Sequence, residues 1–322
     1  MAKLLCVSDL HDDEARLSQL PGFSKGCDAI ITAGDDLDRI VQVNGQQNYE
    51  SSVLLAELIK KHQPKKKASK EKLHEFAVLC REFEQNSTKE KMEGIQAFIK
   101  ANPEVGEMLN AESGIEAEFR SHYEKRAEAI NKHYKKTSLP VFGTLGNHDM
   151  LPALEKLTAI NYLAGNAAEF RGISIAGLPA TGEWPQAAGM FQQHYAHLQE
   201  YTPLQGKDTE VSGLAKKLLS HKGKIDLLVT HKAYREDIQE WDPGYQEGGM
   251  LHEFGVDAGA AAVGKKFSPK LSVFGHYHMA RAKVKRSEDG SQWFLYVGPN
   301  AAVKVELDSG NTPVAFESMY YC

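Results

Sequence analysis

Five short apolar segments of this 322-residue chain are each followed at once by residues of the kinds that bind metal ions. The segments are residues 3–8, 28–33, 139–145, 225–230 and 271–274. Their length and apolar content predict buried strands, and the helical periodicity between several of them indicates an α/β fold. Ligands in open α/β sheets bind at the carboxyl ends of the strands. The pattern therefore predicts one site built from five strand ends.

The residues after these strands offer carboxylate, imidazole and amide donors, a mixture that suits Mn, Fe or Zn. They are Asp9 and His11, Asp35 and Asp38, Asn147 and His148, His231, and His276 and His278. Singly, each group has an ordinary explanation, because Asp9 can cap a helix and the sequence G-N-H-D at 146–149 can be a turn. Together they exceed the ligands of one tetrahedral ion. They fit two ions about 3.5–4 Å apart with one shared carboxylate, for which Asp35 is the best candidate.

A long helical segment interrupts the alternation of strands and helices. Apolar periodicity at 70–83, 89–100 and 115–134 predicts helices there, so we expect a domain formed by residues 1–43 and 138–322 and a helical insert at 44–137. Both ends of the insert are expected near the site. The insert is therefore expected to cap the site and select substrates, or else to pack as a bundle on the side of the domain.

Charge is distributed unevenly between these two parts. Residues 60–136 carry 17 Lys and Arg against 13 Asp and Glu, whereas the rest of the chain carries 21 against 30. The basic run at 60–67 is explained by a solvated helix end, with an anion-binding or nucleic-acid surface as the alternative. It lacks interleaved aromatic residues, and the net charge of -5 does not favour a general nucleic-acid binder.

The remaining sequence supports a cytoplasmic protein. No apolar run is long enough to span a bilayer, and the N-terminal apolar segment is too short for a signal peptide. The four cysteines show no paired spacing and are expected to be reduced thiols. Further along the chain, periodicity predicts helices at 152–163 and 211–219 and strands at 170–177, 293–297 and 302–307.

The five blocks of donor residues resemble the motifs of the calcineurin-like metallophosphoesterases. The blocks are D-L-H at 9–11, G-D-D-L-D at 34–38, G-N-H-D at 146–149, His231, and G-H-Y-H at 275–278. The resemblance covers the chain outside residues 44–137 and implies a four-layer α-β-β-α sandwich with two divalent metal ions, manganese first and iron, zinc or nickel as alternatives. It implies one ion held by Asp9, His11, Asp35 and His278, and a second held by Asp35, Asn147, His231 and His276.

The same resemblance implies the chemistry. A hydroxide activated by the two metal ions would attack the phosphate ester, His148 would be the general acid, and Asp38 would hold its ring. G-N-H-D and G-H-Y-H favour a phosphodiesterase or small-molecule phosphatase. The alternatives are a nuclease, a protein Ser/Thr phosphatase or an inactive scaffold of the same fold. The chain departs from the family at Asp12, where many members have glycine, and in the size of its insert.

Overall fold

The computed structural model describes residues 1–37, 39–43, 46–63, 68–85, 88–146, 149, 156–179, 213–233, 258–277 and 281–321. The chain forms two compact units, one made of Met1–Glu50 with Tyr123–Cys322 and the other of Ser51–His122. The domain boundaries inferred from the sequence, and the role of the insert as a cap or a side bundle, stay predictions.

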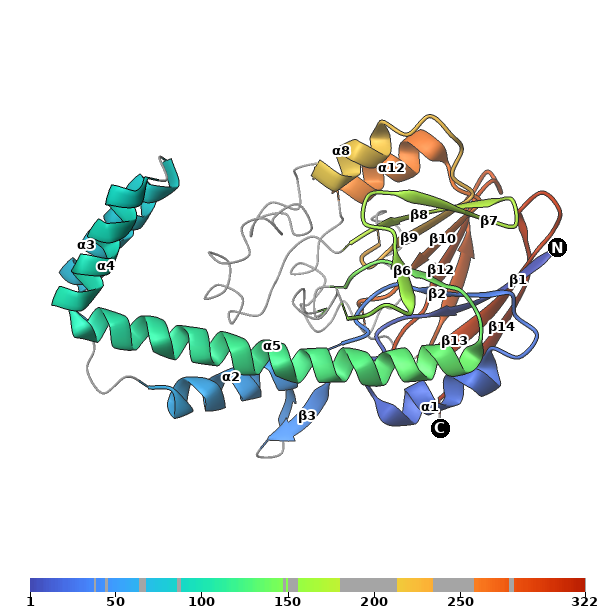
Figure 1. Ribbon diagram of the computed structural model, residues 1–322. Helices are drawn as coiled ribbons and strands as arrows, with labels where there is room; N and C mark the ends of the chain where they lie inside the picture. The colour runs from blue at the N-terminus through green and yellow to red at the C-terminus, as the bar shows by residue number, and fades with distance from the viewer. Residues whose placement is uncertain are drawn as a thin grey trace. The chain divides into compact units, whose positions relative to one another are not determined.

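The larger unit contains two six-stranded sheets (Figure 1). The first has the strand order β14-β13-β1-β2-β5-β6, in which β1, β2, β5 and β6 are parallel to one another. β13 is antiparallel to both β1 and β14. The bounds are β1 Ala2–Val7, β2 Ala29–Thr32, β5 Val141–Gly143, β6 Ile160–Tyr162, β13 Ala301–Leu307 and β14 Pro313–Tyr320.

The second sheet has the order β11-β12-β10-β9-β8-β7. Its four central strands are parallel, and β11 and β7 are antiparallel edge strands. β1, β2, β9 and β10 therefore lie inside their sheets, and the donor residues follow their carboxyl ends. The bounds are β7 Ala167–Phe170, β8 Ile173–Leu178, β9 Leu227–Thr230, β10 Leu271–Phe274, β11 Lys283–Arg286 and β12 Trp293–Tyr296.

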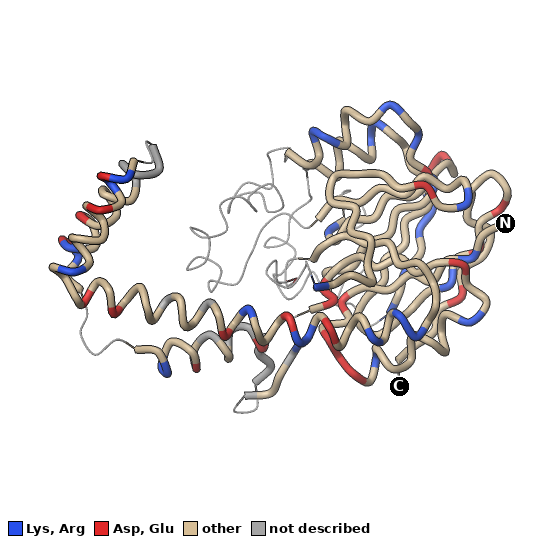
Figure 2. The backbone as a smooth tube through the Cα atoms, in the orientation of Figure 1, with Lys and Arg blue, Asp and Glu red and all other residues tan. Residues whose placement is uncertain are grey.

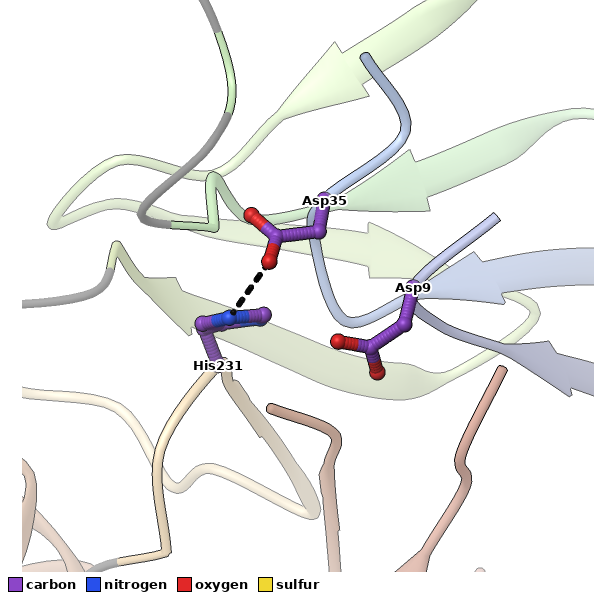
Figure 3. Close-up of side chains that lie close together, drawn as sticks. All are labelled: Asp9, Asp35 and His231. Carbon is purple, nitrogen blue, oxygen red and sulfur yellow. Dashed lines mark ion pairs between the residues drawn. The ribbon is translucent and has the colours of Figure 1, made fainter. Parts of the chain in front are cut away.

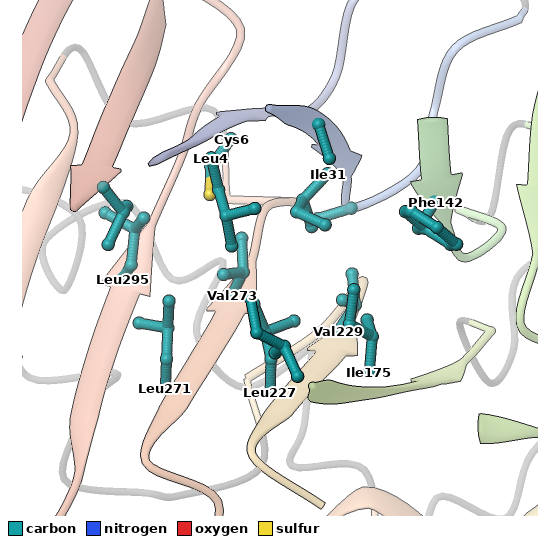
Figure 4. Packing of buried hydrophobic residues seen from close by; sticks show 14 of the residues in the cluster. Leu4, Cys6, Ile31, Phe142, Ile175, Leu227, Val229, Leu271, Val273 and Leu295 are labelled. Atoms are coloured by element: carbon teal, nitrogen blue, oxygen red, sulfur yellow. The ribbon is translucent and has the colours of Figure 1, made fainter. Parts of the chain in front are cut away.

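The main hydrophobic core lies between the two sheets (Figure 4). Leu4 and Ile31 of the first sheet share one buried cluster with Leu227, Val273 and Leu295 of the second. Side chains alternate between the two faces of a strand, so every second residue of β1 and β2 enters this layer. The residues between them are buried as well, which requires a further layer on the outer face of the first sheet.

Helices cover the outer faces of both sheets, so the larger unit is a four-layer α-β-β-α sandwich (Figure 1). α8 (Gly213–Leu219) and α12 (Ala258–Phe267) pack on the second sheet through a separate apolar cluster that includes Leu218 and Phe274. α1 (Glu14–Phe23) and the last turns of α5 (Pro103–Thr137) lie over the first sheet. The fold class predicted from the sequence is confirmed.

The smaller unit is helical. It contains most of α2 (Glu50–Lys61), all of α3 (Lys70–Gln85) and α4 (Lys89–Ala101), and the first part of α5. Acidic and basic residues are interspersed on α3 and α4 (Figure 2). No helix among the described residues has both the length and the apolar character needed to cross a membrane.

Two local predictions were wrong. Periodicity at 152–163 predicts a helix, but Ile160–Tyr162 is strand β6, which pairs in parallel with β5. The insert expected to be helical over 44–137 is not helical at its start, where β4 (Gln46–Tyr49) pairs with β3 (Ile40–Val43) in an antiparallel hairpin before α2. In both places β-branched and aromatic residues find strand partners that local periodicity cannot reveal.

Candidate metal centre

The ends of β1, β2 and β9 bring two carboxylates and one imidazole together (Figure 3). Asp9 comes shortly after β1, Asp35 after β2, and His231 directly after β9. One potential ligand atom from each side chain lies within 4.8 Å of the corresponding atoms of the other two, and all three residues are buried. These side chains, far apart in sequence, therefore form a compact donor group at one edge of the sandwich.

The carboxylate of Asp35 lies between imidazoles from both halves of the chain. Its Oδ2 atom is 3.2 Å from Nε2 of His231 and 4.0 Å from Nε2 of His11. Both histidines are buried, so these contacts form away from bulk water. This position suits a carboxylate shared between two cations.

The orientation of His231 is fixed by the backbone. Its Nδ1 atom lies 2.7 Å from the carbonyl oxygen of Ala33 and donates a hydrogen bond to it, so Nε2 faces the carboxylates. Burial lowers the pKa of His231, but the carboxylates of Asp35 and Asp9 and the Ala33 carbonyl outweigh it and raise the pKa to about 9. A proton on Nε2 therefore balances the carboxylates, and a cation could take its place.

His276 adds a third imidazole to this edge. Its backbone N–H lies 3.1 Å from both carboxylate oxygens of Asp9, and its Nδ1 atom is 3.2 Å from Nε2 of His231. Burial, together with the charges of His231 and Lys232, lowers the pKa of His276 well below its usual value. His276 is therefore a neutral imidazole, which is the form that binds metal ions.

The loops after β1 and β2 remain paired beyond the sheet. Asp9 N–H donates to the Gly34 carbonyl at 2.9 Å, His11 N–H donates to the Asp35 carbonyl at 2.8 Å, and Asp12 N–H donates to the Asp36 carbonyl at 2.9 Å. These bonds continue the alignment of two neighbouring strands into their loops. The donors from β1 and β2 are consequently held side by side by the backbone.

Left-handed backbone conformations concentrate in the loops after β1, β2 and β10. Asp9, His11, Asp12, Asp35 and His276 have φ between 48° and 73°. Residues with a Cβ rarely adopt such angles, and surrounding structure has to hold them there. Strained backbone conformations cluster at functional sites. Their presence here supports a functional site at the same edge of the sandwich where the donor side chains meet.

Two glycines allow the chain to approach the carboxylates closely. A Cβ on Gly275 would lie 1.9 Å from Ser8 Oγ and 2.3 Å from an oxygen of Asp9, and a Cβ on Gly146 would lie 2.0 Å from an oxygen of Asp35.

The donor set of two buried carboxylates and three imidazoles suits Mn, Fe or Zn. The described residues therefore fit a bound divalent cation.

We expect Gly275→Ala to displace Asp9 and to weaken cation binding, because the added methyl group overlaps Ser8 and Asp9. The variant should lower the melting temperature and reduce Mn²⁺ affinity in a calorimetric titration. Gly22→Ala is the matched control: its Cβ meets nothing within 4 Å, and alanine stabilises a compatible helical position by about 0.5 kcal/mol. Unchanged Mn²⁺ affinity in Gly275→Ala would contradict this account of the glycine.

Four residues assigned to the site from the sequence lie outside the described residues. They are Asp38, Asn147, His148 and His278. Their assigned roles stay predictions. The described chain reaches Gly146 and Tyr277, each directly before one of these residues, and both adjoin the loops described above.

Asp149, which ends the G-N-H-D block, has a structural role that was not predicted from the sequence. Its carboxylate accepts N–H bonds from Gly146 at 2.8 Å, Asp35 at 3.0 Å and Leu37 at 3.0 Å. It therefore ties the loop after β5 to the loop after β2. An acidic residue three positions after Gly146 was the available signal, because such a carboxylate can accept hydrogen bonds from nearby backbone amides.

No known family profile and no curated protein matches this chain in sequence. One crystal structure covers 100% of this chain and 99% of its own length, at 13% identity and a TM-score of 0.53. The protein TT1561 of Thermus thermophilus has 12% identity, the same coverage and a TM-score of 0.45.

A putative 5'-nucleotidase from Staphylococcus aureus, in complex with alpha-ketoglutarate, is 12% identical and covers 99% of this chain, with a TM-score of 0.40. This chain spans 54% of that protein's length. At these sequence identities the likeness concerns the fold alone. The first of the three structures, with a TM-score of 0.53, supports the similarity in fold.

Proposed function

We propose that this protein is a metal-dependent phosphoesterase that hydrolyses phosphate esters with two divalent cations, manganese being the preferred metal. The observation that carries the proposal is the meeting of Asp9, Asp35 and His231 within 4.8 Å at the ends of parallel strands. His11 and His276 lie beside this group. Together with the five motif blocks of the sequence, this donor set matches phosphoester hydrolysis better than a structural ion pair.

The proposed cations would share Asp35. Asp9 and His11 would hold the first, and His231 and His276 would hold the second. His278 and Asn147 would complete the two ligand sets, as the resemblance of the sequence motifs suggests. When bound, the cations would neutralise phosphate oxygens and lower the pKa of a water molecule toward neutrality.

The residues of the chain would supply the remaining chemistry. The Ala33 carbonyl keeps Nε2 of His231 turned toward the carboxylates, and the Asp149 carboxylate joins Gly146 to the loop of Asp35. His148 would donate a proton to the leaving alkoxide, with Asp38 keeping its ring oriented. A phosphodiester or a small phosphomonoester is the proposed substrate class.

A panel of phosphate esters tests this function. Protein stripped of metal should hydrolyse nothing, and adding Mn²⁺ should restore turnover of bis(4-nitrophenyl) phosphate or 4-nitrophenyl phosphate. Single-stranded DNA, RNA and a phosphopeptide complete the panel, and slower cleavage of all three is expected. Metal-loaded protein that cleaves none of these esters would contradict the proposal and favour an inactive scaffold.

A further inference from the structure

The last turns of α5 contact the two loops that hold the first donors. Arg126 forms an ion pair with the carboxylate of Asp12, and the hydroxyl of Tyr134 donates to Asp36 Oδ1 at 2.7 Å. Asp12 follows His11 directly, and Asp36 follows Asp35 directly. Each contact from α5 therefore reaches the residue next to a proposed metal ligand.

Both of these carboxylates are buried. Asp12 is 5% exposed and Asp36 is fully buried, so neither could be left without a polar partner except at a large cost in stability. Both oxygens of Asp36 are bonded, one to Tyr134 and the other to the hydroxyl of Thr32 at 2.9 Å. Arg126 also lies 3.9 Å from Glu50, the first residue of α2. These contacts determine how the loops pack against the helix.

The loops need such support because their backbone is strained. His11, Asp12 and Asp35 have φ of 49°, 48° and 56°, and conformations of this kind persist only where the surroundings hold them. Arg126 and Tyr134 are eight residues apart on one helix, about 12 Å along its axis. Backbone bonds between the loops already set their spacing, and two contacts from one rigid helix can in addition fix the orientation of both loops.

We propose that α5 is a positioning element of the metal centre. Arg126 acts through Asp12 to hold His11, and Tyr134 acts through Asp36 to hold Asp35, in their metal-binding conformations. This inference rests on the proposed function only in assuming that these loops bind a cation. Because coupling is reciprocal, cation binding should also stabilise the packing of α5 on the loops.

The test compares Mn²⁺ affinity between variants by calorimetric titration in the absence of substrate. Arg126→Met keeps the alkyl chain and removes the charge, and Tyr134→Phe removes one hydroxyl. Each should weaken Mn²⁺ binding about tenfold, the usual effect of losing a partner that orients a ligand. Arg126→Lys should recover part of the affinity. Lys125→Met and Lys132→Met change exposed residues of the same helix and should bind as the wild type does.

A second measurement separates positioning from general stability. Hydrogen exchange of residues 123–137 should slow on addition of Mn²⁺ in the wild type and slow less in Tyr134→Phe, a variant that keeps the aromatic ring and loses only the hydroxyl. Wild-type affinity in both Arg126→Met and Tyr134→Phe would overturn the proposal, as would a wild-type protein that binds no Mn²⁺. A wild type that binds Mn²⁺ and cleaves no ester would contradict the proposed function while leaving this comparison valid.

Discussion

Asp35→Asn should abolish ester hydrolysis and weaken cation binding at both positions of the proposed centre. The carboxylate lies 3.2 Å from His231 and within 4.8 Å of the Asp9 donor group, so its charge acts on donors from both sheets. Asparagine has nearly the same shape but no charge. We expect affinity for Mn²⁺ to fall by more than the roughly 100-fold seen when an outer partner of a ligand is lost.

The measurement is Mn²⁺ stoichiometry by elemental analysis, combined with turnover of an aryl phosphodiester. Glu306→Gln serves as the control, because this carboxylate forms an ion pair with Lys3 on the sheet and is half exposed. The control should keep both cations and full turnover. An Asp35→Asn protein that retained two tightly bound cations would show that Asp35 is not the shared ligand.

His148→Asn should lower turnover while leaving both cations bound. The Gly146 N–H donates to the Asp149 carboxylate at 2.8 Å, and this bond uses no atom of the His148 side chain. Loss of a general acid lowers the rate by about 10²–10⁴ for esters with poor leaving groups. The loss should be smaller for nitrophenyl esters, whose leaving group needs little protonation.

Comparing kcat for an alkyl ester and a nitrophenyl ester in wild type and His148→Asn measures this dependence. His74→Asn is the matched control, because His74 is an exposed residue of α3 in the helical unit. An equal loss on both esters would argue against proton donation by His148. A loss of bound cation would instead assign it a ligand role.

The strands that carry the donors are predictable because each is a short apolar run followed closely by glycine, an acidic residue or histidine. β1, β2, β9 and β10 were expected within a few residues of their observed bounds. Their meeting at one edge follows from parallel pairing, which places the carboxyl ends of neighbouring strands together. The fold class could therefore be deduced from local pattern and a general rule of sheet topology.

The contacts that support the loops are not predictable in the same way. Asp36 looks like any acid in a polar loop, and only the tertiary structure shows it enclosed between Thr32 and Tyr134, a residue far along the chain. β6 was missed for the same reason, since its strand conformation depends on pairing with β5. Both features depend on contacts between residues distant in sequence, and such contacts override the local periodicity from which a helix at 152–163 was expected.

The central claim, a pair of cations sharing Asp35, is tested most directly by a crystal structure of the Mn²⁺-loaded protein with anomalous diffraction collected at the manganese edge. We expect two anomalous peaks about 3.5–4 Å apart, both within bonding distance of the Asp35 carboxylate. Asp9 and His11 should contact one peak, and His231 and His276 the other. A single peak that Asp35 does not touch, or no peak at the ends of β1, β2 and β9, would contradict it.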